Sequence, residues 1–327
     1  MQLLLAPVIR SATCTLVLVA LGGGAAIAGE RATTQQPAAT AAADPAPTRA
    51  VLVTGASTGI GRRITERLAA NGFWVYATAR KDADLEALAR IPNVQPLRMD
   101  VTQDADIAAA VATVTKAGRG LHGLVNNAGV AVVGSFADTT PEDFDWVMQV
   151  NAYGPYRVTR AFTPLLVESR GRITTIGSIS GILSSRDLGV YSMSKHAVEA
   201  FADSLAAQLA PAGVAVSVVE PGNYDSEIGR NAAARTGRTS RMTDRSQYKP
   251  PDEVADAVLQ FLTEPSPKRR YMVVPNAAEA EVTIRKAIEE LVQLNEGHAY
   301  TYDRDALVMM LDEALAKARP KVAAAAP

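Results

Sequence analysis

The chain has 327 residues, and 48% of them are hydrophobic, which is enough for one large core or for a core with a small appendage. The formal net charge of −1 provides no argument for a basic face of the kind that nucleic acid requires. A single cysteine, Cys14, excludes a disulfide framework, and the histidines at 122, 196 and 298 lack ligand spacing, so no metal site is expected.

The first 28 residues have the pattern of a targeting segment. Arg10 precedes an apolar run from Ser11 to Leu21, and Ala26-Ile27-Ala28 fits a small-residue cleavage site. We expect a cleaved signal peptide over residues 1–28 and an exported, periplasmic protein. Two alternatives stay open: an uncleaved membrane anchor, or a start site assigned too far upstream, which would leave a cytoplasmic protein. Residues 29–49 are expected to form a disordered linker because they are rich in Ala, Thr, Gln and Pro.

From Ala50 onward, short runs rich in Val and Ile alternate with longer segments of helical spacing. The predicted strands are Ala50–Thr54, Phe73–Thr78, Val94–Met99, Leu121–Asn126, Arg172–Ile176 and Val214–Val219. The predicted helices between them are Gly61–Ala70, Asp104–Lys116, Pro141–Val167 and Ser192–Leu209. Nearly apolar strands separated by helices indicate a parallel sheet covered on both faces. The sequence therefore predicts a doubly wound (Rossmann) α/β domain over residues 50–275, with ligands beyond the carboxyl ends of its strands.

A polar stretch from Pro221 to Pro250 interrupts this pattern. Its arginines are Arg230, Arg235, Arg238, Arg241 and Arg245. They could grip an anionic group of a ligand. We expect a solvated lid loop instead, because the stretch has little periodicity. A helix over Asp252–Leu262 and a last strand at Tyr271–Val274 follow. Residues 276–327 are expected to be a helical extension with amphipathic helices over Asn276–Asn295 and Arg304–Arg319.

A glycine-rich turn joins the first predicted strand to the first predicted helix. Glycine lets the backbone approach a pyrophosphate, which then lies at the helix N-terminus, where free N–H groups and the helix dipole favour an anion. A tight turn without a ligand is the alternative, but the strand–turn–helix placement favours a dinucleotide site. The predicted contacts in this turn are Gly55, Ser57, Gly59, Ile60 and Gly61.

The ends of the second and third predicted strands bear on the choice of cofactor. An acidic residue after the second strand would bind the adenosine ribose, whereas a basic residue accommodates a 2′-phosphate. This chain has Arg80 there, followed by Lys81, so the sequence favours NADP over NAD. A solvated loop charge is the alternative. Asp100 and Val101, just after the third strand, are expected at the adenine edge.

Tyr191 and Lys195 are spaced i, i+4 at the start of a predicted helix, so they share one face. A free tyrosine has a pKa near ~10, and a nearby ammonium lowers that value by stabilising the phenolate. Ser178 follows the fifth predicted strand, where its hydroxyl can hold a substrate oxygen. The Tyr-x-x-x-Lys spacing by itself would indicate only an ordinary helix face.

Taken together, these elements resemble the short-subunit branch of the short-chain dehydrogenase/reductase family, from about Ala50 to Val274. The elements that carry the resemblance, in chain order, are the Thr-Gly-x-x-x-Gly-x-Gly turn at Thr54–Gly61, Asn-Asn-Ala-Gly at Asn126–Gly129, Asn151, Ser178, the Tyr191/Lys195 pair and Pro221-Gly222. Three residues between the first two glycines favour this branch over the longer epimerase-type branch.

The resemblance implies a role for each catalytic residue. Tyr191 would be the acid/base, and Ser178 would orient and polarise the carbonyl. Lys195 would lower the pKa of the tyrosine and bind the nicotinamide ribose, while Asn151 would anchor a water in the proton relay. General-base logic supports this assignment, because alcohol oxidation must release a proton as the hydride leaves.

Asn127, Pro221 and Gly222 are implied to flank the cofactor. The family often places a threonine after the Pro-Gly pair, whereas this chain has Asn223-Tyr224-Asp225-Ser226, in which Ser226 can substitute. The sequence Glu220-Pro221-Gly222 is similar to members that act on hydroxysteroids and retinoids, which favours a lipophilic substrate.

We therefore expect an NADP-dependent oxidoreductase that interconverts a secondary alcohol and a carbonyl compound and, by resemblance, forms a homo-oligomer. A dinucleotide-sensing protein without catalysis is the alternative from another class, since fold does not prove chemistry. An isomerase or dehydratase on the same fold is a third. A sensor would have no need for Ser178, Asn151, Tyr191 and Lys195 together.

Overall fold

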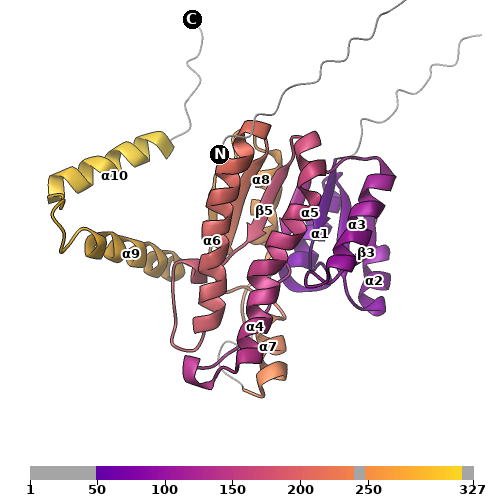
Figure 1. Ribbon diagram of the computed structural model, residues 1–327, viewed down its shortest axis with the longest axis horizontal. Coiled ribbons are helices and arrows are strands. Elements are labelled where there is room, and N and C mark those ends of the chain that lie inside the picture. The colour runs from indigo at the N-terminus through magenta and orange to yellow at the C-terminus, as the bar shows by residue number, and fades with distance from the viewer. Residues whose placement is uncertain (1–48, 239–246, 319–327) are drawn as a thin grey trace, which may run out of the picture. The chain divides into compact units, whose positions relative to one another are not determined.

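The computed structural model describes residues 49–238 and 247–318 (Figure 1). The predicted signal peptide and all but the last residue of the predicted linker lie outside the described residues, as do Arg241 and Arg245.

A parallel sheet of seven strands lies at the centre of the described chain, in the order β3-β2-β1-β4-β5-β6-β7. The strands are β1 (Ala50–Val53), β2 (Trp74–Ala79), β3 (Val94–Arg98), β4 (Gly123–Asn126), β5 (Arg172–Ile176), β6 (Ala215–Pro221) and β7 (Arg270–Val273). The strand order reverses between β1 and β4, and such a switch point opens a crevice beyond the carboxyl ends of the strands. The predicted doubly wound α/β fold is confirmed.

Successive strand residues point to opposite faces of the sheet. The strands are apolar on both faces, so helices cover both of them. Val51 and Val53 enter one core with α1 and α8, whereas Leu52 enters the other with α3, α5 and α6. The helices are α1 (Gly59–Ala70), α2 (Asp82–Ala89), α3 (Asp104–Ala117), α4 (Pro141–Met148), α5 (Gly154–Glu168), α6 (Gly189–Leu209), α7 (Ile228–Thr236), α8 (Asp252–Thr263), α9 (Ala277–Leu294) and α10 (Arg304–Ala318). Short 3₁₀ turns lie at Phe136–Asp138, Ile179–Gly181 and Ala210–Ala212.

The structure differs from the sequence predictions in two segments near the crevice. Pro141–Val167 is not one helix: a π-helical turn at Gln149–Tyr153 separates α4 from α5, and such turns are frequent at functional sites. The prediction of a loop over the whole of Pro221–Pro250 is wrong, because α7 lies inside that stretch. The buried face of this helix is small and centred on Ala232. The other residues are mostly polar, so the sequence lacks the apolar periodicity that would predict a helix.

The two C-terminal helices, α9 and α10, follow β7 as predicted. The first turn of α9 meets the end of β6, where the Asn223 N–H donates to Glu279 Oε2 at 2.8 Å. Large apolar side chains farther along both helices are exposed, among them Ile288, Leu294 and Leu311. Within residues 49–238 and 247–318, no helix has the length and apolar character needed to cross a membrane.

Candidate active site

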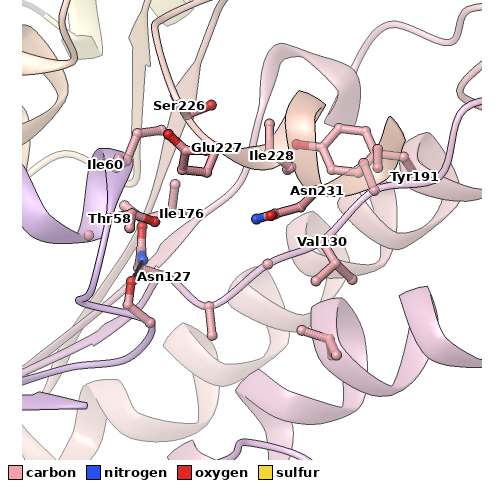
Figure 2. Close-up of a pocket in the computed structure, with 18 of the residues that line it drawn as sticks. Thr58, Ile60, Asn127, Val130, Ile176, Tyr191, Ser226, Glu227, Ile228 and Asn231 are labelled. Carbon is pink, nitrogen blue, oxygen red and sulfur yellow. Dashed lines mark hydrogen bonds between the residues drawn. The ribbon is translucent and has the colours of Figure 1, made fainter. Parts of the chain in front are cut away.

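A cavity of about 930 Å³ opens where the carboxyl ends of the strands meet α7. Among its lining residues are all the predicted cofactor contacts and three of the four predicted catalytic residues: Gly55, Ser57, Gly59, Ile60, Gly61, Arg80, Asp100, Val101, Asn127, Ser178, Tyr191, Lys195, Pro221 and Gly222. Figure 2 shows Thr58 and Asn127 at one end of the pocket and Tyr191 at the other, with Asn231 between them. Asn151 lies behind the wall of the cavity and is 2% exposed.

The glycine turn is shaped to approach a ligand closely. Gly55 and Gly59 have φ of +62° and +52°, a conformation that favours glycine. A Cβ at Gly61 would overlap the Asn127 amide nitrogen and the Gly55 carbonyl oxygen. Among the described residues, no side chain caps α1 at Thr58 and no acidic residue lies in its first turn. The N-terminus of α1 therefore keeps N–H groups and a positive dipole end for an anion.

Asn127 and Thr54 fasten the glycine turn to the end of β4. The Asn127 Nδ2 atom donates to the carbonyl oxygens of Thr54 and Gly55, at 2.9 Å each. The Thr54 Oγ1 atom accepts from the N–H groups of Asn127 and Ala128, at 2.9 and 3.0 Å. Thr54 follows β1 and Asn127 follows β4, and these two strands are parallel neighbours. The sheet therefore sets the geometry of the glycine turn.

Arg80 lines the cavity at the ends of β2 and β3. Its Nη1 atom is 3.4 Å from Asp100 Oδ2, and 63% of its side chain is exposed. Burial acts to raise the pKa of Asp100, but hydrogen bonds from the Thr102 N–H and hydroxyl and the charge of Arg80 outweigh it, so that pKa lies below its ordinary value. Asp100 is therefore ionised at neutral pH and holds the guanidinium across the ends of β2 and β3.

Ser178, Tyr191 and Lys195 converge at the other end of the cavity. The Lys195 ammonium is 5.5 Å from the centre of the Tyr191 ring and donates to the Ile176 carbonyl at 2.8 Å. Burial lowers the pKa of Lys195 to about 8, and the charge of Glu199 opposes that shift. Ser178 Oγ accepts from the Ser180 N–H at 3.1 Å and lies 3.5 Å from the Pro221 carbonyl oxygen, to which it donates.

Asn151, in the π-helical turn, ties the catalytic helix to the loop after β4. Its Oδ1 accepts from the Val130 N–H at 2.9 Å, and its Nδ2 donates to the Val130 carbonyl and to Ser194 Oγ, at 2.8 and 2.9 Å. Ser194 in turn donates to the Tyr191 carbonyl at 2.7 Å. Both Nδ2 protons of Asn151 are thus used within the protein. Its role as the anchor of a relay water stays a prediction.

Sequence reasoning did not assign Trp146 or Asn231 to the site, and it expected Arg235 in a solvated lid loop. Trp146 on α4 and Asn231 and Arg235 on α7 all line the cavity. Arg235 Nε lies 2.6 Å from Asp143 Oδ1, and its guanidinium carbon is 4.0 Å from the centre of the Trp146 ring. Arg230 pairs with Glu227 in the same way. Both arginines are thus paired with carboxylates of the protein.

Comparison with known proteins places this geometry in a family. The family model of the short chain dehydrogenases matches residues 49–237. The mitochondrial D-beta-hydroxybutyrate dehydrogenase of Bos taurus is 36% identical over 194 residues, which are 56% of this chain and 56% of that protein. The 11-beta-hydroxysteroid dehydrogenase type 2 of Homo sapiens is 39% identical over 57% of this chain and 48% of its own length. The chain thus spans about half the length of these curated relatives.

Solved structures agree with this placement. A short-chain dehydrogenase from Streptomyces avermitilis superposes with a TM-score of 0.67 at 30% identity, covering 76% of this chain and 95% of that one. Another from Burkholderia cenocepacia, in complex with NADP, gives a TM-score of 0.63 at 27% identity over 75% of this chain and 95% of its own. With the family model matched across the glycine turn, Ser178 and the Tyr191/Lys195 pair, the chain belongs to the short-chain dehydrogenase family.

Proposed function

We propose that this chain is an NADP-preferring oxidoreductase that interconverts a secondary alcohol and a carbonyl compound. The observation that carries the proposal is that one cavity holds both the glycine turn before α1 and the set Ser178, Tyr191 and Lys195. The first group fits a dinucleotide, and the second fits proton transfer to or from a substrate oxygen.

The residues of the cavity fit the parts of NADP. The uncapped N-terminus of α1 suits the pyrophosphate, and Arg80 suits the 2′-phosphate of the adenosine ribose. Lys195 would hold the nicotinamide ribose, and Asn127, Pro221 and Gly222 would flank the cofactor. Bound NADP would accept hydride from the alcohol, and its reduced form would return it to the carbonyl carbon.

The chain itself supplies the proton chemistry. In oxidation, the Tyr191 phenolate takes the hydroxyl proton of the alcohol; in reduction, the Tyr191 hydroxyl returns a proton to the carbonyl oxygen. The Lys195 ammonium stabilises the phenolate. Ser178, held by the Ser180 N–H, donates to the same substrate oxygen and orients it.

The substrate that we propose is lipophilic. Apolar side chains line the cavity, and four of them, Ala131, Val133, Leu188 and Ile228, pack in one cluster with Tyr191. The similarity to the 11-beta-hydroxysteroid dehydrogenase type 2 of Homo sapiens supports a lipophilic substrate. The apolar walls of the cavity favour a substrate with a hydrocarbon ring or chain over a small, highly charged metabolite.

Homo-oligomerisation through α5 and α6 is part of the proposal. Tyr153 and Tyr156 near the start of α5 and Met193 on α6 are 51%, 47% and 43% exposed, although they are large and apolar. Contiguous exposed apolar residues favour a protein interface. Light scattering that gives only monomer at micromolar concentration would contradict this assignment.

We also propose export through residues 1–28, with an uncleaved anchor or an upstream misassigned start as the alternatives. N-terminal sequencing of the mature protein from fractionated cells separates the three.

The test of function is a panel of ketones and alcohols, steroids and retinoids included, assayed in both directions with NADPH/NADP and NADH/NAD. Turnover with NADPH or NADP on a lipophilic member supports the proposal. Tight NADPH binding without turnover on any member would favour a dinucleotide sensor instead. Product isomers formed without a net change in cofactor absorbance would favour an isomerase.

A further inference from the structure

Two carboxyl groups lie against each other behind the catalytic residues. Glu199 is on α6, one turn after Lys195, and its side chain is 13% exposed. Glu220 is on β6, immediately before Pro221-Gly222, and its side chain is 3% exposed. Both carboxyl groups approach the same nitrogen, Nε of Arg270, at 3.0 and 3.5 Å, so they lie side by side.

The arginine nearest the pair is shared with a third carboxylate. Arg270 on β7 places its Nε atom 3.0 Å from Glu199 Oε2 and 3.5 Å from Glu220 Oε1. The same guanidinium also binds Asp203 on α6 at 2.7 Å, and Asp203 pairs with Arg269 at 3.0 Å. Within the described chain, the buried Oε1 atoms of Glu199 and Glu220 have no conventional donor. Two ionised groups here would leave two buried carboxylate oxygens without a hydrogen bond, which is costly, whereas a proton held between the two groups would give them a donor.

Protonation is also favoured by burial. Burial, and then the charge of Glu199, raise the pKa of Glu220 to about 7, while Arg270 opposes the shift. Burial likewise raises the pKa of Glu199 against the opposing charge of Arg270. The groups that face the pair are Lys195 and Asp203 on α6, Arg270 on β7 and Arg269 just before that strand.

Glu199 also packs against the backbone on each side of Ser178. Glu199 reaches so close to Gly177 that a Cβ there would lie 3.1 Å from Glu199 Oε1 and 2.6 Å from Val218 Cγ1. At Gly181 a Cβ would lie 3.1 Å from Glu199 Cγ. These two glycines bracket Ser178. The Glu199 side chain therefore packs directly behind the turn that presents the serine hydroxyl.

We propose that Glu199 and Glu220 are positioning residues that share one proton, support the Ser178 turn and set the charge beside Lys195. The last part rests on the proposed function, because it matters only if Ser178 and Lys195 act on a substrate. The proton sharing does not rest on it and can be measured without cofactor or substrate.

The first experiment measures the free energy of unfolding of the full chain against pH by urea titration, for the unmodified protein, Glu199→Gln and Glu220→Gln. Between about 4.5 and about 7, the folded pair keeps a proton that the unfolded chain has lost. The unmodified protein must therefore lose stability relative to either variant as pH rises through that window. In each variant the glutamine amide donates to the remaining carboxylate, so the extra proton is no longer needed.

Asp203→Asn is the matched control. It removes one negative charge beside the same Arg270, but Asp203 is 53% exposed and lies outside the pair. Its stability difference from the unmodified protein should lack the fall between about 4.5 and about 7 that both glutamine variants reveal. Parallel stability curves for all four proteins would overturn the shared proton. If the glutamine variants do not fold, infrared titration of the unmodified protein decides, because a protonated carboxyl band must persist at pH 6 and disappear above about 7.

The second experiment tests the positioning role through the pH profile of alcohol oxidation. Glu199 raises the pKa of Lys195, so Glu199→Gln should lower the pH at which oxidation falls off by on the order of one unit. Asp203→Asn should follow the unmodified enzyme. Coincident profiles for Glu199→Gln and the unmodified enzyme would overturn the positioning role even if the proton is shared. An unmodified protein with no turnover would instead overturn the proposed function, and the stability curves would still decide the proton sharing.

Discussion

The ammonium of Lys195 lies 5.5 Å from the centre of the Tyr191 ring, one helical turn further along α6, with the Ile176 carbonyl 2.8 Å from its Nζ atom. That carbonyl belongs to the last residue of β5, so the end of the sheet fixes the cation beneath the ring. A cation held there favours the phenolate over the phenol. The relationship links a buried lysine to the acid/base role that we propose for Tyr191 at the cavity wall.

Replacing Tyr191 by Phe should remove turnover without removing the fold. The substitution deletes one hydroxyl, and proton transfer by a positioned group contributes on the order of 10²–10⁴ in rate. We expect kcat to fall by at least that factor, while the Kd for NADPH, measured by fluorescence titration, stays within about twofold. Tyr300→Phe is the control, because Tyr300 is 82% exposed and lies between α9 and α10, away from the cavity lining. Near-full turnover in Tyr191→Phe would show that another group transfers the proton.

Lys195→Ala should cost as much in turnover as Tyr191→Phe, or more. The lysine tunes the tyrosine, so both residues serve one proton-transfer step. The double variant should therefore be no slower than about the worse single variant. Turnover numbers for the four proteins on one active alcohol give the interaction energy. Losses that multiply in the double variant would mean that the two residues act independently.

NADPH binding should weaken as pH rises through about 8, the pKa to which burial lowers Lys195. Above that value the ammonium loses its proton and with it the charge and one hydrogen-bond donor toward the ribose. NADPH affinity should fall rather than rise with pH, because the protonated form of Lys195 is the one that binds the ribose. Isothermal titration of NADPH from pH 6 to 9.5 should show this slope in the unmodified protein and a flatter curve in Lys195→Ala. The same slope in both proteins would assign it to a different group.

Arg80→Asp should shift cofactor preference from NADP toward NAD. The change removes the partner of the 2′-phosphate and places a second carboxylate beside Asp100, which repels that phosphate. A charge-assisted hydrogen bond contributes about 1.5–3 kcal/mol, so kcat/KM for NADP should fall roughly 10- to 100-fold. Arg90→Asp, at the exposed end of α2, is the control for the charge reversal. Equal use of both cofactors by the unmodified protein would count against the assignment of Arg80.

Local patterns in the sequence predict the glycine turn and the candidate catalytic residues, but not the residues of α4 and α7 that line the rest of the cavity. The glycine turn, Ser178 and the Tyr191/Lys195 pair follow strands or start helices, so their spacing places them at the carboxyl edge of the sheet. Helix α7 is different, because its arginine-rich polar face is held by Arg235 reaching Asp143, 92 positions earlier in the chain. The proximity of Glu199 and Glu220 has no local signal in the sequence, because only the fold brings α6 and β6 together.

Arg235 joins α7 to α4 over the catalytic end of the cavity. Its Nε atom lies 2.6 Å from Asp143 Oδ1, and its guanidinium stacks on Trp146 with 4.0 Å to the ring centre. Both Trp146 and Arg235 line the cavity, so the contact sets the shape of the wall that a lipophilic substrate would meet. The ion pair and the stacking hold α7 against α4.

Asp143→Asn should therefore weaken substrate binding and leave cofactor binding unchanged. A partly exposed ion pair with a stacked arginine contributes about 1 kcal/mol, which corresponds to a rise in KM for the alcohol of roughly fivefold. Glu142→Gln is the matched control, since Glu142 also lies in the first turn of α4 and is exposed. Steady-state kinetics on one lipophilic alcohol and NADPH titrations of both variants provide the comparison. If the two variants raise KM equally, the loss comes from the end of α4, and Arg235 does not hold the wall.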